Sequence, residues 1–311
     1  MDILLKLGIC KVFFASITFI MVLLGTLINI CEPYLPVIII KTFRYGKFAS
    51  EGKSALVTNV ELPKSYFKHF YLTSAFIYSP IAIYEIVRVF ILHGEVSDWH
   101  KAILNISCGS ERVATISALR VVIATVLLVL QVFRRFHDTH FVSVFSKSAT
   151  INLGHYLVGM AYYPAVFLII FSEAPKFAIP FSNDQSNVHL HHLGIMEMCA
   201  IILFLWAWYH QYVTSKILGN LRKNTKGDVV SQSYKIPEGD WFNYLSSPHS
   251  VAEIIMYTAL TLLLANNTGW WYVYAWVLSN QVETILLSHW WYQSHFKNFP
   301  VTRKALIPFI Y

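Results

Sequence analysis

Charged residues are scarce in this sequence: only 13% of its 311 residues are Asp, Glu, Lys or Arg, and 56% are hydrophobic. Soluble globular chains carry about a quarter charged residues. A chain this apolar could not cover itself with polar surface in water. The composition therefore favours an integral membrane protein over a soluble domain.

Several motifs of soluble enzymes are also missing. No two of the 13 glycines are separated by a single residue, so the GxG of a Rossmann phosphate loop is absent. GxxxxGK[ST], GxSxG and HExxH are absent too. The four cysteines form no CxxC pair, which argues against redox or metal chemistry at Cys10, Cys31, Cys108 and Cys199. Any nucleotide must be held in another way.

A short histidine cluster is present at His189, His191 and His192. It resembles in composition one part of the metal sites of membrane desaturases, because imidazole is a good iron or zinc ligand. Such a site needs several histidine boxes on one membrane face. The topology below puts His137 and His140 on the other face, so we expect no metal site.

Long apolar runs recur along the chain, and a helix needs about 20 apolar residues to cross the hydrocarbon core. Turn residues at 266–269 separate the last two runs. The sequence predicts an all-α integral membrane fold of about seven transmembrane helices in a single domain, residues 1–311. The predicted crossings are residues 12–31, 67–92, 113–133, 150–171, 193–212, 251–265 and 270–290.

Basic residues are distributed unevenly between the loops. With the N-terminus in the lumen, 16 Lys and Arg residues fall in cytosolic segments and five in lumenal segments. The positive-inside rule then predicts a lumenal N-terminus and a cytosolic C-terminus. The same rule explains the net charge of +7, and without a contiguous basic face we expect no nucleic-acid partner. A glycosylation sequon at Asn105 falls in a loop predicted to be lumenal.

The segment of residues 218–253, most of which falls in a predicted cytosolic loop, carries four basic side chains and a turn followed by an aromatic residue. Arginine can clamp phosphates with two parallel hydrogen bonds and lysine with a point charge. The same charges could serve only to orient the chain. Spacing alone leaves both interpretations open for Arg222, Lys223, Lys226 and Lys235.

Glu253 lies just inside the sixth predicted crossing, and Glu283 lies inside the seventh. Ionisable groups at membrane depth are costly and usually face the interior of the bundle. We expect both to do so, with Arg or His as partners if their role is structural. Glu61 lies in a polar loop before the second crossing and by itself would be an ordinary surface charge.

In the C-terminal sequence, residues 288–292 read SHWWY, residues 295–300 HFKNFP and residues 303–309 RKALIPF. This sequence resembles the closing motif of the steroid 5α-reductase family. Further stretches are similar to the polyprenol (polyprenal) reductase branch of that family. They are FRYGK (43–47), LPKSYFKHFY (62–71), FVSVFS (141–146), HQY (210–212), ILGNLRKN (217–224) and IPEGDWFNYLSSP (236–248).

The resemblance implies a membrane reductase that holds NADPH among the cytosolic halves of its C-terminal helices, within residues 210–311. Its implied reaction is reduction of the α-isoprene C=C bond of polyprenal, a step from polyprenol to dolichol that supports protein N-glycosylation. The aldehyde is favoured because an allylic alcohol has no acceptor oxygen to take up charge. The implied partner is a long-chain polyprenyl lipid, and the implied location is the endoplasmic reticulum membrane.

The resemblance also assigns candidate site residues. Glu61 matches a family carboxylate that helps to hold the substrate carbonyl, and His289 is the second catalytic candidate. The cofactor-binding candidates are Arg222, Lys223, Tyr234, Lys235, Glu253, His289, Tyr292 and Arg303.

One stretch departs from the steroid-reducing enzymes. The segment that supplies their carbonyl-binding tyrosine reads QVFRR at residues 131–135, without a tyrosine, which leaves the proton donor open. Three alternatives remain: a 3-oxo-5-alpha-steroid 4-dehydrogenase acting on steroid enones, a lipid-binding protein or transporter without turnover, and a membrane methyltransferase that uses S-adenosylmethionine.

Overall fold

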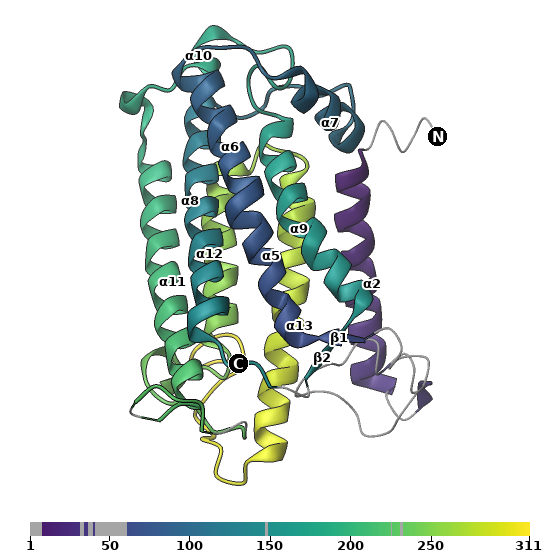
Figure 1. Cartoon of the computed structure of the whole chain (residues 1–311), viewed down its shortest axis with the longest axis vertical. Coiled ribbons are helices and arrows are strands. Elements are labelled where there is room, and N and C mark those ends of the chain that lie inside the picture. The colour runs from purple at the N-terminus through teal and green to yellow at the C-terminus, as the bar shows by residue number, and fades with distance from the viewer. Residues whose placement is uncertain are drawn as a thin grey trace.

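The protein is a bundle of long helices (Figure 1). The computed structural model describes residues 8–31, 34–36, 40, 61–146, 149–224, 226–230 and 233–311. The FRYGK stretch, residues 43–47, lies outside the described residues. Helices form at every predicted crossing. Those of the bundle are α2 (Ile9–Cys31), α5 (Phe67–Thr73) continuing through η4 (Ser74–Tyr78), α6 (Ser79–Ile86) and η5 (Val87–Ile91), then α8 (Ala118–His137), α9 (Leu153–Ser172), α11 (Ile195–Asn220), α12 (Pro248–Leu264) and α13 (Trp270–His295).

Shorter elements connect these helices. η4, η5 and η6 (Asp138–Val142) are π-helical turns, and η3 (Lys64–Tyr66), η7 (Leu190–His192) and η8 (Asp240–Asn243) are 3-10 turns. The remaining helices of the described residues are α7 (Asp98–Cys108) and α10 (Asn183–Ser186).

Three helical segments of the described residues are long and apolar enough to cross a membrane: Ile9–Cys31, Lys64–Ile91 and Leu153–Ser172. Pro248–Leu264 is apolar but shorter. Large apolar side chains such as Phe19 and Ile202 are 66% and 65% exposed. In a helix, whose backbone groups are already hydrogen-bonded, such outward apolar surface suits contact with lipid. The prediction of an all-α membrane protein is confirmed at this level.

Several predicted boundaries were wrong. The helix at the third predicted crossing, α8, begins at Ala118 rather than at residue 113, and the helix at the fifth, α11, continues to Asn220 rather than ending at residue 212. The apolar run therefore begins before α8 does, whereas intrahelical hydrogen bonds continue α11 through polar residues after its apolar run ends. The sequon at Asn105 lies in helix α7 rather than in a loop, where its Oδ1 accepts a hydrogen bond from Arg112.

Two short strands close one end of the bundle. β1 (Glu61–Pro63) pairs antiparallel with β2 (Thr150–Asn152), in a register that sets Glu61 opposite Asn152. Each strand leads directly into a helix, β1 through η3 into α5 and β2 into α9. The Asn152 side chain caps α9 by accepting a hydrogen bond from the Gly154 amide at 2.8 Å. The pairing therefore fixes the start of α5 beside the start of α9.

The turn between α12 and α13 is pinned by a buried asparagine. The Asn267 amide donates to the carbonyl of Ile169 at 2.7 Å, and its oxygen accepts from the Trp270 amide at 3.1 Å. This turn lies at the opposite end of α12 from Pro248, which fits the first turn of the helix because it needs no amide donor there.

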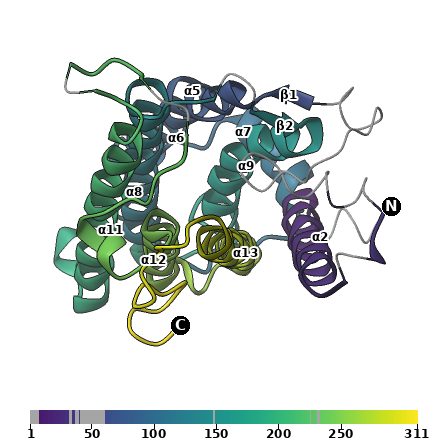
Figure 2. The same cartoon turned by 90° about the horizontal axis from the view of Figure 1, so that it is seen from below.

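The two ends of the bundle differ in what they carry. α7 and α10 lie at the upper end of Figure 1. The lower end holds β1, β2, the C-terminal ends of α11 and α13 and the C-terminus of the chain. The view from below shows α13 between α12 and α2, with α9 above it in the picture (Figure 2). The lower end therefore gathers segments that are far apart in the sequence.

Candidate active site

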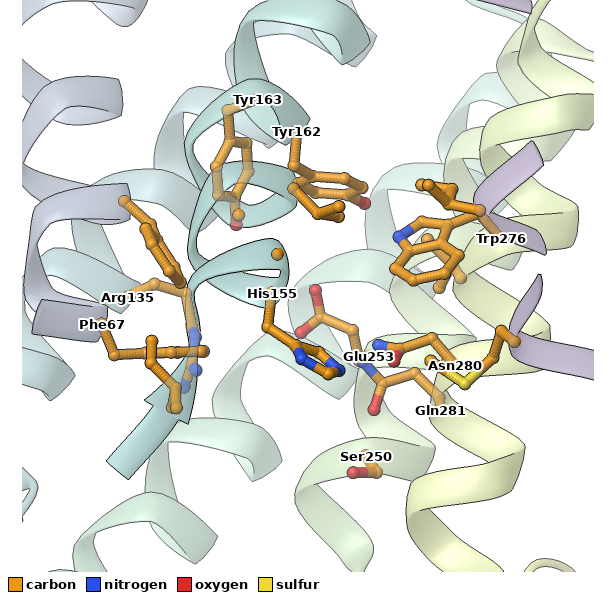
Figure 3. A pocket seen from close by; sticks show the side chains of 18 of the residues that line it. Phe67, Arg135, His155, Tyr162, Tyr163, Ser250, Glu253, Trp276, Asn280 and Gln281 are labelled. Carbon is orange, nitrogen blue, oxygen red and sulfur yellow. The ribbon is translucent and has the colours of Figure 1, made fainter. Parts of the chain in front are cut away.

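A cavity of about 420 Å³ opens between α2, α5, α9, α12 and α13. Its apolar wall includes Ile17 and Met21 of α2 and Phe67 and Phe70 of α5. In Figure 3, Arg135 and Phe67 lie on one side of the cavity and Trp276, Asn280 and Gln281 on the other. Such a cavity, mostly apolar with a few convergent polar groups, is the usual form of a small-molecule site.

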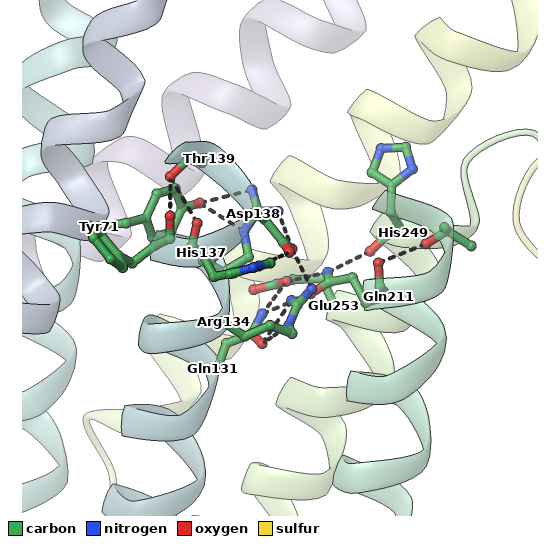
Figure 4. A network of polar contacts seen from close by, with 12 residues as sticks. Tyr71, Gln131, Arg134, His137, Asp138, Thr139, Gln211, His249 and Glu253 are labelled. Atoms are coloured by element: carbon green, nitrogen blue, oxygen red, sulfur yellow. Dashed lines mark hydrogen bonds and ion pairs between the residues drawn. The ribbon is translucent and has the colours of Figure 1, made fainter. Parts of the chain in front are cut away.

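The polar floor of the cavity is a network between α8, α11 and α12 (Figure 4). Oε2 of Glu253 accepts hydrogen bonds from the amide of Gln131 at 3.0 Å and the amide of Gln211 at 2.6 Å. The Gln211 amide also donates to the carbonyl of His249 at 2.7 Å. Glu253 therefore faces the interior as predicted, but these partners are glutamine amides rather than Arg or His.

A buried ion pair anchors this network from behind. Arg134 donates to Oδ2 of Asp138 at 2.7 Å, and it also donates to Oε1 of Gln131 at 2.9 Å and to Gln211. Arg134 and Asp138 are both buried. Because a buried pair is costly unless its remaining hydrogen-bond sites are occupied, these additional bonds stabilise the arrangement. The pair holds Gln131 and Gln211 in position around Glu253.

Aromatic hydroxyls line the side of the cavity formed by α5 and α9. Tyr71, Tyr162 and Tyr163 all face it, and Tyr162 donates to the hydroxyl of Tyr257 at 2.6 Å. Arg135 donates to the hydroxyl of Tyr71 from Nε at 3.3 Å and from a terminal nitrogen at 3.1 Å. Phenol donors therefore lie in the same cavity as the Glu253 carboxylate.

The basic loop after α11 contacts the last helix. The Arg222 guanidinium lies 5.2 Å from the ring centroid of Tyr234, and the Tyr234 ring contacts Trp291 of α13 edge-on at 4.9 Å. Arg222 also donates to the carbonyl of Val144 at 2.7 Å. Arg222 and the C-terminal end of α13 therefore lie at the same end of the bundle, as a common pocket requires.

The tail after α13 folds back onto the segment before α12. Arg303, 4% exposed, donates to the carbonyl of Pro237 at 2.9 Å. Burial lowers the pKa of Arg303 below its ordinary value, and Tyr292 and Glu238 act in the opposite direction. Nε of Arg303 has no hydrogen-bond partner among the described residues, so the buried guanidinium retains a donor for an anion.

The tail also positions His289. Nδ1 of His289 lies 2.6 Å from the hydroxyl of Ser246, which also donates to the carbonyl of Lys304 at 3.2 Å. Tyr292, one turn further on, is buried and stacks on Phe299 at 5.5 Å. His289 and Tyr292 are therefore held in place by Ser246 and by Phe299, respectively.

The remaining predicted residues lie at the edge of this arrangement. Glu61 accepts a hydrogen bond from Thr150 at 3.0 Å on the strand pair, and its register partner Asn152 lines the cavity, although Glu61 itself does not. Lys223 reaches the carbonyl of Phe141 at 3.5 Å. Lys235 is exposed. Their roles stay predictions.

Sequence reasoning missed the partners of Glu253 and the cavity-facing hydroxyls. Gln131 lies in the stretch noted only for its lack of tyrosine, and Gln211 in the HQY stretch used only for resemblance. Tyr71 ends the LPKSYFKHFY stretch. A polar residue within an apolar run was the available signal at Gln131 and Gln211.

Fold and site together define a helical membrane protein with a polar-floored internal cavity and a cationic, aromatic end. The family described as 3-oxo-5-alpha-steroid 4-dehydrogenase matches residues 177–311. A "Polyprenal reductase" of Drosophila melanogaster is 36% identical over 309 residues, covering 98% of this chain and 94% of its own. Proteins of the same name from Xenopus tropicalis and Homo sapiens are 34% and 31% identical, each covering 86% of this chain and respectively 86% and 84% of their own. The chain belongs to the steroid 5α-reductase family, in the group of the polyprenal reductases.

Proposed function

We propose that this chain reduces the α-isoprene C=C bond of polyprenal with NADPH, within the conversion of polyprenol to dolichol. The observation that carries the proposal is the near full-length similarity to proteins named polyprenal reductase. The cavity supports it, because apolar side chains of α2 and α5 would suit an isoprenoid chain while Glu253 and the phenols offer polar contacts.

The basic and aromatic residues at the lower end of the bundle are suited to binding NADPH. Arg222 and Lys223 offer cations beside the aromatic Tyr234, and the buried Arg303 retains an unpaired donor. In the proposal Arg222, Lys223, Lys235 and Arg303 bind phosphates. When bound, NADPH supplies hydride to the β-carbon of the enal.

Other residues orient the reacting groups in this proposal. Glu253, fixed by Gln131 and Gln211, accepts hydrogen bonds from the nicotinamide end of the cofactor, and Tyr234, His289 and Tyr292 shape its pocket. Glu61 helps to hold the substrate carbonyl from the strand pair beside Asn152. Donors at that oxygen stabilise the negative charge that develops there, which is usually a large part of catalysis.

We also propose that all seven long helical segments cross the endoplasmic reticulum membrane, with the N-terminus in the lumen. The excess of basic residues in the described segments at the lower end of Figure 1 supports this orientation. The cofactor site would then face the cytosol, and the lipid would enter from the bilayer between helices.

The test is NADPH oxidation by purified protein in detergent or nanodiscs, with polyprenal and polyprenol offered separately and dolichal identified as product. We expect turnover with the aldehyde and none with the alcohol. Lack of any NADPH oxidation with polyprenal would refute the proposal and favour a lipid-binding protein. Binding of S-adenosylmethionine in place of NADPH would indicate a methyltransferase.

A steroid enone is the second candidate substrate, because the C-terminal 135 residues match a family described as 3-oxo-5-alpha-steroid 4-dehydrogenase. Steroid enones share the conjugated carbonyl of polyprenal. The same assay with a 3-oxo-4-ene steroid decides between them, and we expect a preference for polyprenal.

A further inference from the structure

Among the phenols of the cavity, Tyr71 has an unusual hydrogen-bonding position. Its hydroxyl receives two hydrogen bonds from Arg135, at 3.3 and 3.1 Å. A guanidinium has five donors and no acceptor, so the tyrosine oxygen must act as the acceptor in both. Arg135 therefore occupies the oxygen lone pairs and leaves the hydroxyl hydrogen unused.

That hydrogen has no other acceptor among the described residues, whereas Tyr71 itself lines the cavity. The guanidinium centre also lies 4.9 Å from the Tyr71 ring centroid, so Arg135 holds both the ring and its hydroxyl. Asp138 in turn lies 3.8 Å from Arg135 and is fully buried. This chain from Asp138 through Arg135 fixes the donor before any ligand arrives.

The other two phenols of the cavity are arranged differently. Tyr162 donates its hydrogen to Tyr257, so that hydrogen is already used. Tyr163 contacts the Tyr71 ring edge-on at 5.8 Å, but its hydroxyl has no hydrogen-bond partner among the described residues to fix its direction. Only the Tyr71 hydroxyl, of these three, combines a fixed oxygen with a cation beside it.

We infer that Tyr71 is the hydrogen-bond donor to the aldehyde oxygen, positioned by Arg135, in place of the tyrosine missing from residues 131–135. The inference rests on the proposed function. Hydride and its electron pair form the new C–H bond at the β-carbon. The alkene electron pair then forms a double bond between the α-carbon and the carbonyl carbon, and the carbonyl pair moves to oxygen.

The resulting enolate oxygen lies against the Tyr71 hydrogen, with the Arg135 charge directly behind the phenol. A donor fixed in advance stabilises such an oxyanion without having to reorganise during the reaction. A proton from water at the α-carbon then restores the carbonyl and completes the reduction. Tyr71 returns to its starting state without losing its proton.

The experiment compares the full-length protein with Tyr71→Phe, which keeps the ring and its contacts with Arg135 and Tyr163. Removing one oxyanion donor lowers kcat by about 10²- to 10³-fold, and we expect a loss of this size with polyprenal while the KM for NADPH stays unchanged. Tyr78→Phe is the matched control, since Tyr78 lies two turns further along the same helical segment and does not line the cavity.

Two further variants separate hydrogen-bond donation by Tyr71 from the positioning of its hydroxyl by Arg135. Arg135→Lys keeps a cation but not the paired donors, so it should lower kcat less than Tyr71→Phe. The double variant should lose no more than Tyr71→Phe alone, because Arg135 acts through the hydroxyl. Monodisperse elution and NADPH affinity report whether each variant is folded.

Several outcomes would overturn the inference. They are a Tyr71→Phe protein with wild-type kcat, an equal loss in Tyr78→Phe, a larger loss in Tyr163→Phe, and a double variant whose losses add. A wild-type protein inactive on polyprenal would refute the proposed function itself, whereas an active wild-type with an unaffected Tyr71→Phe refutes only the role of Tyr71.

Discussion

Two carboxylates at opposite ends of α12 show how differently a membrane bundle can treat the same chemical group. Glu173 contacts the turn after α12, where it accepts from Thr115 at 2.7 Å and from the Thr268 amide at 3.1 and 3.2 Å. Lys11 lies 3.8 Å away. Both oxygens of Glu173 are therefore engaged by the protein itself.

Glu253, near the start of α12, is satisfied on one side only. Gln131 and Gln211 both donate to its Oε2, whereas Oε1 has no hydrogen bond among the described residues and the side chain lines the cavity. A carboxylate whose two oxygens both accept hydrogen bonds from the protein stabilises the fold. One with an unused oxygen facing a cavity can accept a hydrogen bond from a ligand. The hydrogen-bond inventory separates the two roles where residue type and burial do not.

The largest effect expected within this comparison is on its cavity side. Glu253→Gln keeps an oxygen to accept from Gln131 and Gln211 but removes the charge. A hydrogen bond to a charged group contributes about 1.5–3 kcal/mol, so we expect kcat/KM for polyprenal reduction to fall by about 10- to 100-fold. Initial rates of NADPH oxidation measure it, and wild-type rates would make Glu253 structural like Glu173.

The next effect concerns the cationic end. Arg222→Gln should raise the KM for NADPH by about tenfold, because one charge-assisted contact worth about 1.4 kcal/mol is lost. Lys226→Gln is the control, since Lys226 is an exposed cation on the same loop. If both variants raise the KM equally, the loop acts by its general charge, and the specific role of Arg222 is wrong.

The helices could be predicted because each depends on a local apolar run. The likeness of the ILGNLRKN stretch and of the tail to a known family likewise identified Arg222 and Arg303 as candidates without any geometry. The grouping of Gln131, Gln211 and Glu253 could not be predicted, since three separate helices bring them together only after packing. No spacing rule in a single sequence indicates such a convergence.

The same limit applies to hydrogen-bond direction. Tyr71 and Arg135 are 64 residues apart, and the sequence gives no sign that one donates to the other. The ends of α11 at Asn220 and of α13 at His295 were also misjudged. Hydropathy predicts the part of a helix that lies in the lipid, whereas backbone hydrogen bonding and contacts outside the lipid determine where the helix ends. Candidate site residues could be named from the sequence, but the hydrogen-bond partners of their side chains could not.

The next prediction tests the structural side of the comparison, where we expect a change in stability and none in activity. Glu173→Gln should lower the free energy of unfolding by about 1–3 kcal/mol, since it weakens bonds to Thr115 and Thr268 and leaves Lys11 without its partner charge. Thermal unfolding of the detergent-purified protein measures the change. Turnover per folded molecule should stay at the wild-type value, and a loss of kcat without a loss of stability would reverse the assignment.

The smallest effect concerns the space in the cavity rather than its polarity. A Cβ at Gly159 would lie 2.4 Å from the ring of Phe70, and both residues line the cavity. In Gly159→Ala the tip of that flexible ring must swing aside, a strain of about 1 kcal/mol that we expect to raise the KM for polyprenal by about fivefold. Phe70→Leu in the same background removes the clash and should return the KM toward wild type. If the KM does not return, Gly159 acts through the backbone of α9. The space between Gly159 and Phe70 then does not limit how the lipid binds in the cavity beside Glu253.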